Sequence, residues 1–122
     1  MTLKKLPLSF SVCKVESLSD ETLRLPFTFT AVTDEEISVV TPTENVRFNT
    51  VSRSDGWRAF RIEGTLDFSL IGILARISTL LAESGIGIFA VSTYNTDYVF
   101  VKEENFPSAL SVMENNGYSI ID

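Results

Sequence analysis

The feature that most constrains the fold is an amphipathic helix followed directly by two short strands, between residues 64 and 102. Apolar residues recur there at three- and four-residue spacing, which places them on one face of a helix. They are Leu70, Ile73, Leu74, Ile77, Leu80 and Leu81. Asp67 or Ser69 is expected to cap the start of this helix, and Gly85 to end it. A turn then leads into two alternating strands, 88–93 and 97–102, which form a hairpin.

The flanking segments extend this unit to a βαββαβ order. A strand is predicted over residues 57–63, before the helix. After the hairpin, Asn105 is expected to cap a second helix with Pro107 in its first turn, and Asn116-Gly117 to end it before a final strand over 118–121. This order is the ferredoxin-like split βαβ unit, in which two helices cover one face of a four-stranded antiparallel sheet.

The first part of the chain is predicted to form a smaller unit of the same kind. Alternating residues predict strands over 8–15, 27–32 and 37–40, followed by a short helix that Thr43 would cap. The polar stretch 49–55 is interpreted as a linker or exposed loop, with Asp55-Gly56 as a turn. We therefore predict an α+β protein with a βαββαβ domain over residues 56–122 and an abbreviated, related half over residues 1–55.

Charge and composition exclude several classes of protein. The chain has 122 residues, 44% of them hydrophobic, and a net charge of −6. An acidic chain with scattered Lys and Arg argues against a nucleic-acid partner, because phosphate binding needs a basic patch. No apolar run approaches the ~18 residues of a membrane span. We therefore expect a cytoplasmic protein with no membrane partner.

The chain contains no histidine and one cysteine, Cys13. Cys13 lies in an alternating strand pattern and is read as a small buried hydrophobic residue. Without histidine, the Ser-His and Cys-His routes to catalysis are closed, and so are histidine metal sites. Carboxylates cluster at 34–36 and 103–104, where a turn and a helix start explain them. We expect no catalytic residue, no metal and no cofactor.

Two neighbouring features carry the candidate site. Gly72 lies early in a strong helix-forming segment, where glycine costs up to ~1 kcal/mol against alanine. Either a ligand group approaches the helix end, whose free N–H groups suit a carboxylate, or the helix packs closely on a strand. The second feature is a run of hydrogen-bonding side chains at the hairpin tip: Ser92, Thr93, Tyr94, Asn95, Thr96 and Asp97. Turn chemistry accounts for only part of this run. A helix end facing Asp97 would match the carboxylate and ammonium of an α-amino acid.

The stretch LDFSLIGILARISTLLAESGIGIFAVSTYNTDYVFV resembles the ACT domain, a small-molecule regulatory βαββαβ module. It is most similar to the small bacterial two-ACT proteins related to the CASTOR arginine sensors. The resemblance extends over residues 57–122, and more loosely over 8–46 through the segment EEISVV. It implies non-catalytic sensing of an amino acid held between ACT units. By position, the ligand would contact Gly72, Ile73 and residues 92–97, and Ser38 and Val39 would close the pocket.

The resemblance also implies a homo-oligomer, which we expect to be a homodimer, and an output passed to a separate protein partner. The alternative is an ACT module that binds no ligand and serves in assembly or protein interaction. Two further hypotheses have less support from the sequence. One is a small enzyme that acts through Asp67, Asp97, Tyr94 or Glu63, and the other is an RNA-binding sheet.

Overall fold

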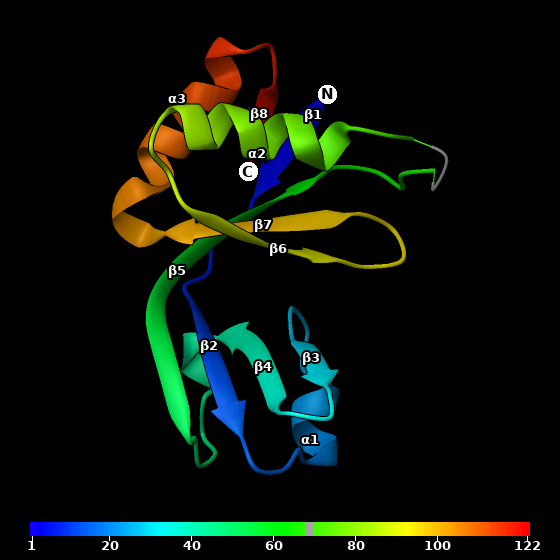
Figure 1. Cartoon of the computed structure of the whole chain (residues 1–122), viewed down its shortest axis with the longest axis vertical. Helices are drawn as coiled ribbons and strands as arrows, with labels where there is room; N and C mark the ends of the chain where they lie inside the picture. The colour runs from blue at the N-terminus through cyan, green and yellow to red at the C-terminus, as the bar shows by residue number, and fades with distance from the viewer. Residues whose placement is uncertain (68–69) are drawn as a thin grey trace. The chain divides into compact units, whose positions relative to one another are not determined.

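A computed structural model describes residues 1–67 and 70–122. The chain forms two compact units. The N-terminal unit is Leu8–Trp57, and the C-terminal unit combines Met1–Pro7 with Arg58–Asp122. Figure 1 gives the labels of the helices and strands. The assignment of residues 1–55 and 56–122 to two domains stays a prediction.

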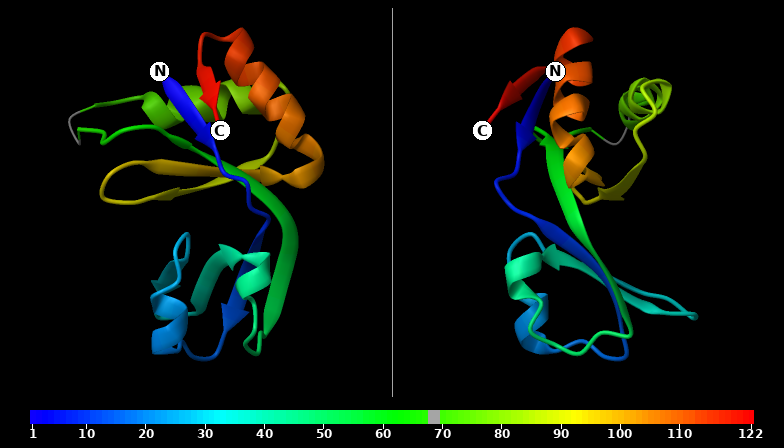
Figure 2. Two further views of the ribbon diagram at one scale, coloured as in Figure 1. Left: turned by 180° about the vertical axis from the view of Figure 1, so that it is seen from behind. Right: turned by 90° about the vertical axis from the view of Figure 1, so that its left-hand side faces the viewer.

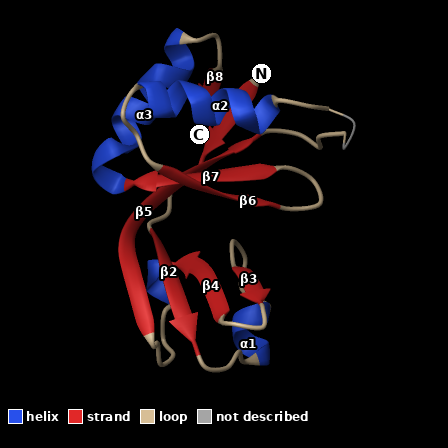
Figure 3. Ribbon diagram, viewed as in Figure 1, coloured by secondary structure: helices blue, strands red, loops and turns tan. Residues whose placement is uncertain are grey.

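The C-terminal unit has the predicted βαββαβ order. Its elements are β5 (Ser52–Ile62, of which the second half lies in this unit), α2 (Ile73–Glu83), β6 (Ile88–Ser92), β7 (Asp97–Lys102), α3 (Phe106–Asn115) and β8 (Ser119–Ile121). The helices α2 and α3 pack on one face of the sheet, as Figure 3 shows. Their apolar faces meet those of the strands in one core, which includes Phe60, Ile77, Leu81, Val99 and Met113. The α+β, ferredoxin-like prediction is confirmed.

A fifth strand, β1 (Thr2–Lys5), lies within the C-terminal sheet and was not predicted. It pairs antiparallel with β5, where Leu3 faces Ile62, and parallel with β8, where Leu3 faces Ile120. The expectation of a four-stranded antiparallel sheet is therefore wrong, because β1 lies between β5 and β8 and is parallel to β8. Leu3 is fully buried in the core, and Figure 2 shows β1 beside β8. A four-residue strand that ends in the lysine pair Lys4-Lys5 is too short to show a recognisable alternation in the sequence.

The helix α2 begins later than predicted and has a different cap. It starts at Ile73, and Gly72 is its N-cap residue instead of Asp67; Ser69 lies outside the described residues. Leu70 precedes the helix and is 53% exposed, so it does not belong to the buried face. The predicted end is confirmed: Gly85 has a φ of 74° and donates to the Ala82 carbonyl, and Ile86 donates to Leu81.

The helix α3 follows a 3-10 turn, η2 (Glu103–Asn105). Pro107 stands in its first turn as predicted, but the Asn105 side chain makes no capping hydrogen bond. The backbone bond from Tyr118 N–H to Met113 and the left-handed Gly117 confirm the predicted end. In the part of the chain that the structure describes, no helix has the length and apolar character that crossing a membrane requires.

The N-terminal unit has the predicted strands and only short helices. Its elements are β2 (Phe10–Val15), α1 (Asp20–Leu23), β3 (Phe29–Val32), β4 (Ile37–Pro42) and the 3-10 turn η1 (Thr43–Asn45), with the first half of β5. The strands pair in the order β3-β4-β2-β5. Cys13 is buried with Val15 and Val39, which confirms its assignment to the core. The alternation of aromatic and threonine residues over 27–32 predicts a strand with one buried face, but β3 is mostly exposed, so this prediction is wrong.

The two units share a repeated segment whose residue numbers differ by sixty. The strand β4 and turn η1 begin at Ile37 and Thr43, and β7 and η2 begin at Asp97 and Glu103. The preceding hairpin turns also match, because both are closed by a threonine backbone N–H that donates to the carbonyl three residues later. The repeat confirms that the first part of the chain is an abbreviated unit of the same type.

The predicted turn at Asp55-Gly56 is wrong, because both residues lie inside β5. Phe10 pairs with Trp57, and Val12 pairs with Ser54. Asp55 and Gly56 therefore together oppose Ser11 in a β-bulge. Gly56 has a φ of 81°, which a bulge permits glycine to adopt. The buried Ser11 hydroxyl donates to Asp55 Oδ1 at 2.6 Å and bonds the Thr43 hydroxyl at 2.8 Å. Thr43 therefore anchors the bulge and does not cap a helix.

The bulge makes the stability of the fold sensitive to acid. The hydrogen bond from Ser11, with further bonds from Arg53, holds the pKa of Asp55 below its usual value of 3.8. A folded pKa below the unfolded one stabilises the protein above the unfolded pKa, and this contribution is lost as pH falls through the folded pKa. We therefore expect Asp55→Asn to lose less stability than the unmodified protein between about pH 5 and pH 2 in urea unfolding. Equal losses would contradict this role for Asp55.

Candidate functional site

A cavity of about 310 Å³ lies between the start of α2 and the tip of the β6–β7 hairpin. Both features belong to the C-terminal unit and lie at the same end of it (Figure 1). The structure thus brings together Gly72, Ile73 and the whole predicted run from Ser92 to Asp97. Among the described residues, the lining is Leu66, Asp67, Leu70, Ile71, Gly72, Ile73, Leu74, Ala75, Ser92, Thr93, Tyr94, Asn95, Thr96 and Asp97.

The start of α2 presents backbone donors to this cavity. The first bond of the helix runs from Arg76 N–H to the Gly72 carbonyl, at 2.9 Å. The N–H groups of residues 73–75 therefore have no carbonyl partner within the helix. Among the described residues, no side chain caps this end, and no acidic residue stands in the first turn. The positive end of the helix dipole is available to an anion.

Gly72 is required by the backbone and not by packing. Its φ is 81°, in the left-handed region that glycine adopts freely. A Cβ added at this position would meet no atom within 4 Å. The explanation that Gly72 lets the helix pack closely on a strand is therefore wrong. The left-handed residue is the N-cap of α2, and the first N–H groups of the helix follow it directly.

Two threonines of the hairpin have structural roles. Thr93 closes the turn, since its N–H and its hydroxyl both donate to the Thr96 carbonyl, at 2.8 and 3.0 Å. The Thr96 side chain is buried, and its hydroxyl donates to the Ile62 carbonyl of β5 at 2.7 Å. The tip is also held from the other side, because Leu66 N–H donates to the Asn95 carbonyl at 2.8 Å. Turn and sheet contacts explain more of this run than the sequence indicated.

Asp97 is the half-buried carboxylate of the hairpin. It pairs with Ser92 across the two strands, and the Ser92 hydroxyl donates to Asp97 Oδ1. This bond fixes the position of the carboxylate, and an ionised carboxylate can accept further hydrogen bonds. Tyr94 is 79% exposed at the tip, beside the cavity.

The sequence reasoning missed several residues of the lining. Asp67 supplies a second carboxylate, although the sequence marks it as one of two candidate helix caps, beside Ser69. Leu70 and Ile71 also line the cavity and are 53% and 94% exposed. Two large apolar residues directly before a glycine at a helix start were the signal, but the apolar spacing assigned Leu70 to the helix and gave Ile71 no role.

Ser38 and Val39 lie on β4, in the N-terminal unit. Val39 is fully buried in the core of that unit. The Ser38 hydroxyl donates to the Glu36 carboxylate at 2.6 Å. Their contribution to the ligand site stays a prediction. Among residues 1–67 and 70–122, no three Cys, Asp or Glu side chains gather as metal ligands.

A ferredoxin-like unit with an open helix start facing a polar hairpin defines a class of small binding modules. Comparison with known proteins identifies the family to which this chain belongs. The sequence model of the ACT domain matches residues 52–115, which is more than half of the chain. The protein therefore belongs to the ACT domain family, which confirms the resemblance.

Individual relatives agree with this assignment. The human cytosolic arginine sensor for mTORC1 subunit 1 is 36% identical over 66 residues, which are 53% of this chain and 20% of that protein. The matched segment thus spans about a fifth of the relative's length. A solved structure from Agobacterium tumefaciens has a TM-score of 0.87 at 26% identity, covering 98% of this chain and 91% of that one. Aspartate kinase of Clostridium acetobutylicum has a TM-score of 0.65 at 17% identity, covering 93% and 33%, and supports the fold alone.

Proposed function

We propose that this protein is a non-catalytic regulatory module that binds an α-amino acid in the cavity between α2 and the β6–β7 hairpin. The observation that carries the proposal is the opposition of two complementary groups across one cavity. The free N–H groups after Gly72 suit the ligand carboxylate, and the Asp97 carboxylate suits an ammonium group. Family membership supports the proposal, and one relative is named as an arginine sensor.

The charge of the cavity favours a basic amino acid. Of the described residues that line it, two are charged, and both are carboxylates, Asp67 and Asp97. A ligand with a second cationic group in its side chain complements this pair better than a neutral one. An acidic side chain would add repulsion. We therefore expect arginine and lysine to bind more tightly than neutral amino acids, and aspartate and glutamate least.

Isothermal titration of ligand-free protein against the twenty amino acids tests this proposal. Binding of basic amino acids with one site per chain is the expected result. An absence of heat for all twenty would refute the function. Binding that favours acidic amino acids would retain an amino-acid sensor but refute the role of the two carboxylates.

A second candidate function is an ACT module that binds no ligand and serves in assembly. The observation in its favour is that Ser92, Thr93 and Thr96 already use their hydroxyls within the hairpin and on β5. A polar hairpin therefore needs no ligand to explain most of its residues. This candidate predicts that no amino acid raises the melting temperature of the protein.

We also propose that the protein forms a homodimer and passes its output to a separate protein partner. A dimer is expected because the edge strand β6 carries no charge to prevent pairing with another chain. Light scattering coupled to gel filtration should give twice the monomer mass of 13.6 kDa. A monomer at all concentrations would contradict the dimer.

A further inference from the structure

The N-terminal unit contains a cavity where its counterpart has helices. By the sixty-residue repeat, Val39 corresponds to Val99, which is packed in the core with residues of α2 and α3. In the N-terminal unit, α1 has four residues, and the chain after η1 continues without a helix corresponding to α3. The core around Val39 is correspondingly small. A cavity of about 460 Å³ remains beside it.

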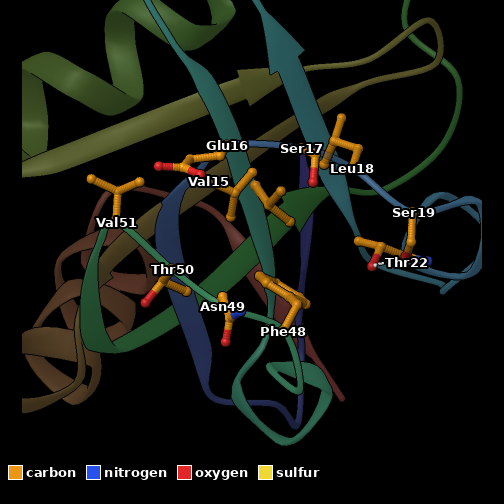
Figure 4. A pocket seen from close by; sticks show the side chains of 11 residues that line it. Val15, Glu16, Ser17, Leu18, Ser19, Thr22, Phe48, Asn49, Thr50 and Val51 are labelled. Carbon is orange, nitrogen blue, oxygen red and sulfur yellow. Dashed lines mark hydrogen bonds between the residues drawn. The ribbon is translucent and has the colours of Figure 1, made fainter.

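This cavity has an apolar floor and a polar rim. Val15 and Val39 are buried, and Leu18 and Phe48 pack against them. The polar residues around it are Glu16, Ser17, Ser19, Thr22, Asn49 and Thr50, and Val51 adds one exposed apolar side chain. Figure 4 shows the side chains of segment 15–22 and segment 48–51 on different sides of a common space. The volume falls within the ~300–1,000 Å³ typical of small-molecule sites, which have apolar walls and a few polar groups.

The charges of the lining select the class of ligand. Of the described residues around this cavity, Glu16 is the single charged one, so no lysine or arginine faces a ligand anion. The start of α1 offers no substitute, because the Ser19 hydroxyl already accepts from Thr22 N–H at 3.1 Å and the first turn carries the acidic residues Asp20 and Glu21. A carboxylate would therefore enter without a counter-charge, whereas an ammonium group can meet Glu16.

We propose that this cavity binds a small primary amine that carries an aliphatic or aromatic group and no carboxylate. The apolar group lies against Val15, Val39 and Phe48, and the ammonium group lies at Glu16. The site is separate from the proposed amino-acid site and does not rest on it. The two cavities then differ in what they require: the C-terminal one needs a carboxylate and an amine, and the N-terminal one excludes the carboxylate.

Backbone amide NMR, with 2-phenylethylamine and phenylalanine as matched probes, tests the proposal on the full chain. The amine should shift resonances of residues 15–22 and 48–51 in a saturable manner. Phenylalanine, which differs by its carboxylate, should shift these same resonances at least tenfold more weakly. No saturable shift in these segments, or equal affinity for the two probes there, would overturn the proposal. Shifts confined to residues 66–75 and 92–97 report the other cavity and would also overturn it.

Two substitutions test separately the charge of Glu16 and the open space of the cavity. Glu16→Gln should weaken amine binding about three- to fivefold, as expected for an exposed ion pair. Glu35→Gln is its matched control, because Glu35 is exposed on the same unit and does not line the cavity. Ser17→Trp places a large side chain at the exposed rim and should abolish the shifts without loss of fold. Unchanged amine binding in both Glu16→Gln and Ser17→Trp would refute the site.

Discussion

Asp97→Asn is expected to weaken amino-acid binding at least about tenfold, which corresponds to ~1.4 kcal/mol. The substitution removes the charge that opposes the start of α2 across the cavity and leaves the ligand ammonium without an anionic partner there. It keeps the shape of the side chain and an oxygen that can accept from Ser92, so the hairpin should fold as before. Isothermal titration with arginine measures the change in affinity.

The matched control is Asp34→Asn, which makes the same chemical change on an exposed residue of the corresponding hairpin turn in the N-terminal unit. This variant should bind arginine with an affinity within about twofold of that of the unmodified protein, because Asp34 does not line the cavity. Equal losses in the two variants would indicate a general effect of net charge and would contradict a specific contact with Asp97. Full retention of affinity in Asp97→Asn would contradict it as well.

Gly72→Ala is expected to destabilise the protein by about 1–2 kcal/mol, because an L-residue is strained in the left-handed region. The cost is conformational, since the added methyl group meets no atom within 4 Å. The melting temperature should fall by about 3–8 °C. Any relief of the strain displaces the first turn of α2, so arginine binding should weaken together with stability.

Gly87→Ala provides the control for this change. Gly87 also has no atom within 4 Å of an added Cβ, but its φ lies outside the left-handed region. Alanine there should be neutral or stabilising by about 0.4–1 kcal/mol. Gly72→Asn should fall between the two, because asparagine tolerates the left-handed region better than alanine. If Gly72→Ala melts at the same temperature as the unmodified protein, the backbone role assigned to Gly72 is wrong.

Periodicity, together with helix-ending glycines and turn residues, was enough to predict the order of the βαββαβ unit. The α2 and α3 stripes, the two glycines that end these helices, and the alternation in β6 and β7 are local signals, each complete within one element. Local signals also predicted the strands β3 and β4 of the N-terminal unit, which pair antiparallel in the structure. The elements that could be predicted are those whose apolar face or end can be recognised from residues within the element itself.

The features that could not be predicted depend on partners far away in the sequence. The strand β1 forms because Leu3 enters a core built by residues 60 and beyond. Asp55-Gly56 has the composition of a turn, but Ser11 opposes it and converts it into a bulge inside β5. The start of α2 was misplaced because Leu70 fits the helical spacing, whereas the left-handed Gly72 prevents the helix from including it.

The candidate site was partly predictable for the same reason. The run from Ser92 to Asp97 is contiguous, so composition marked it, and the topology placed it beside Gly72. Asp67 and Ile71 lie in a loop without periodicity, where sequence gives no direction to a side chain. The structural use of Thr96 also depends on the distant Ile62 carbonyl.

The position of β1 has a consequence for how the protein is made. Residues 2–5 leave the ribosome before both of their partner strands, and Leu3 cannot meet its β8 neighbour until Ile120 has been synthesised. The N-terminal unit, Leu8–Trp57, is complete in the nascent chain long before that. Folding of the C-terminal sheet is therefore a late event, after translation of nearly the whole chain, and β1 must stay unpaired until then. An elongation pause with the chain outside the ribosome up to residue 57 should thus leave the N-terminal strand without either partner strand and accessible to protease.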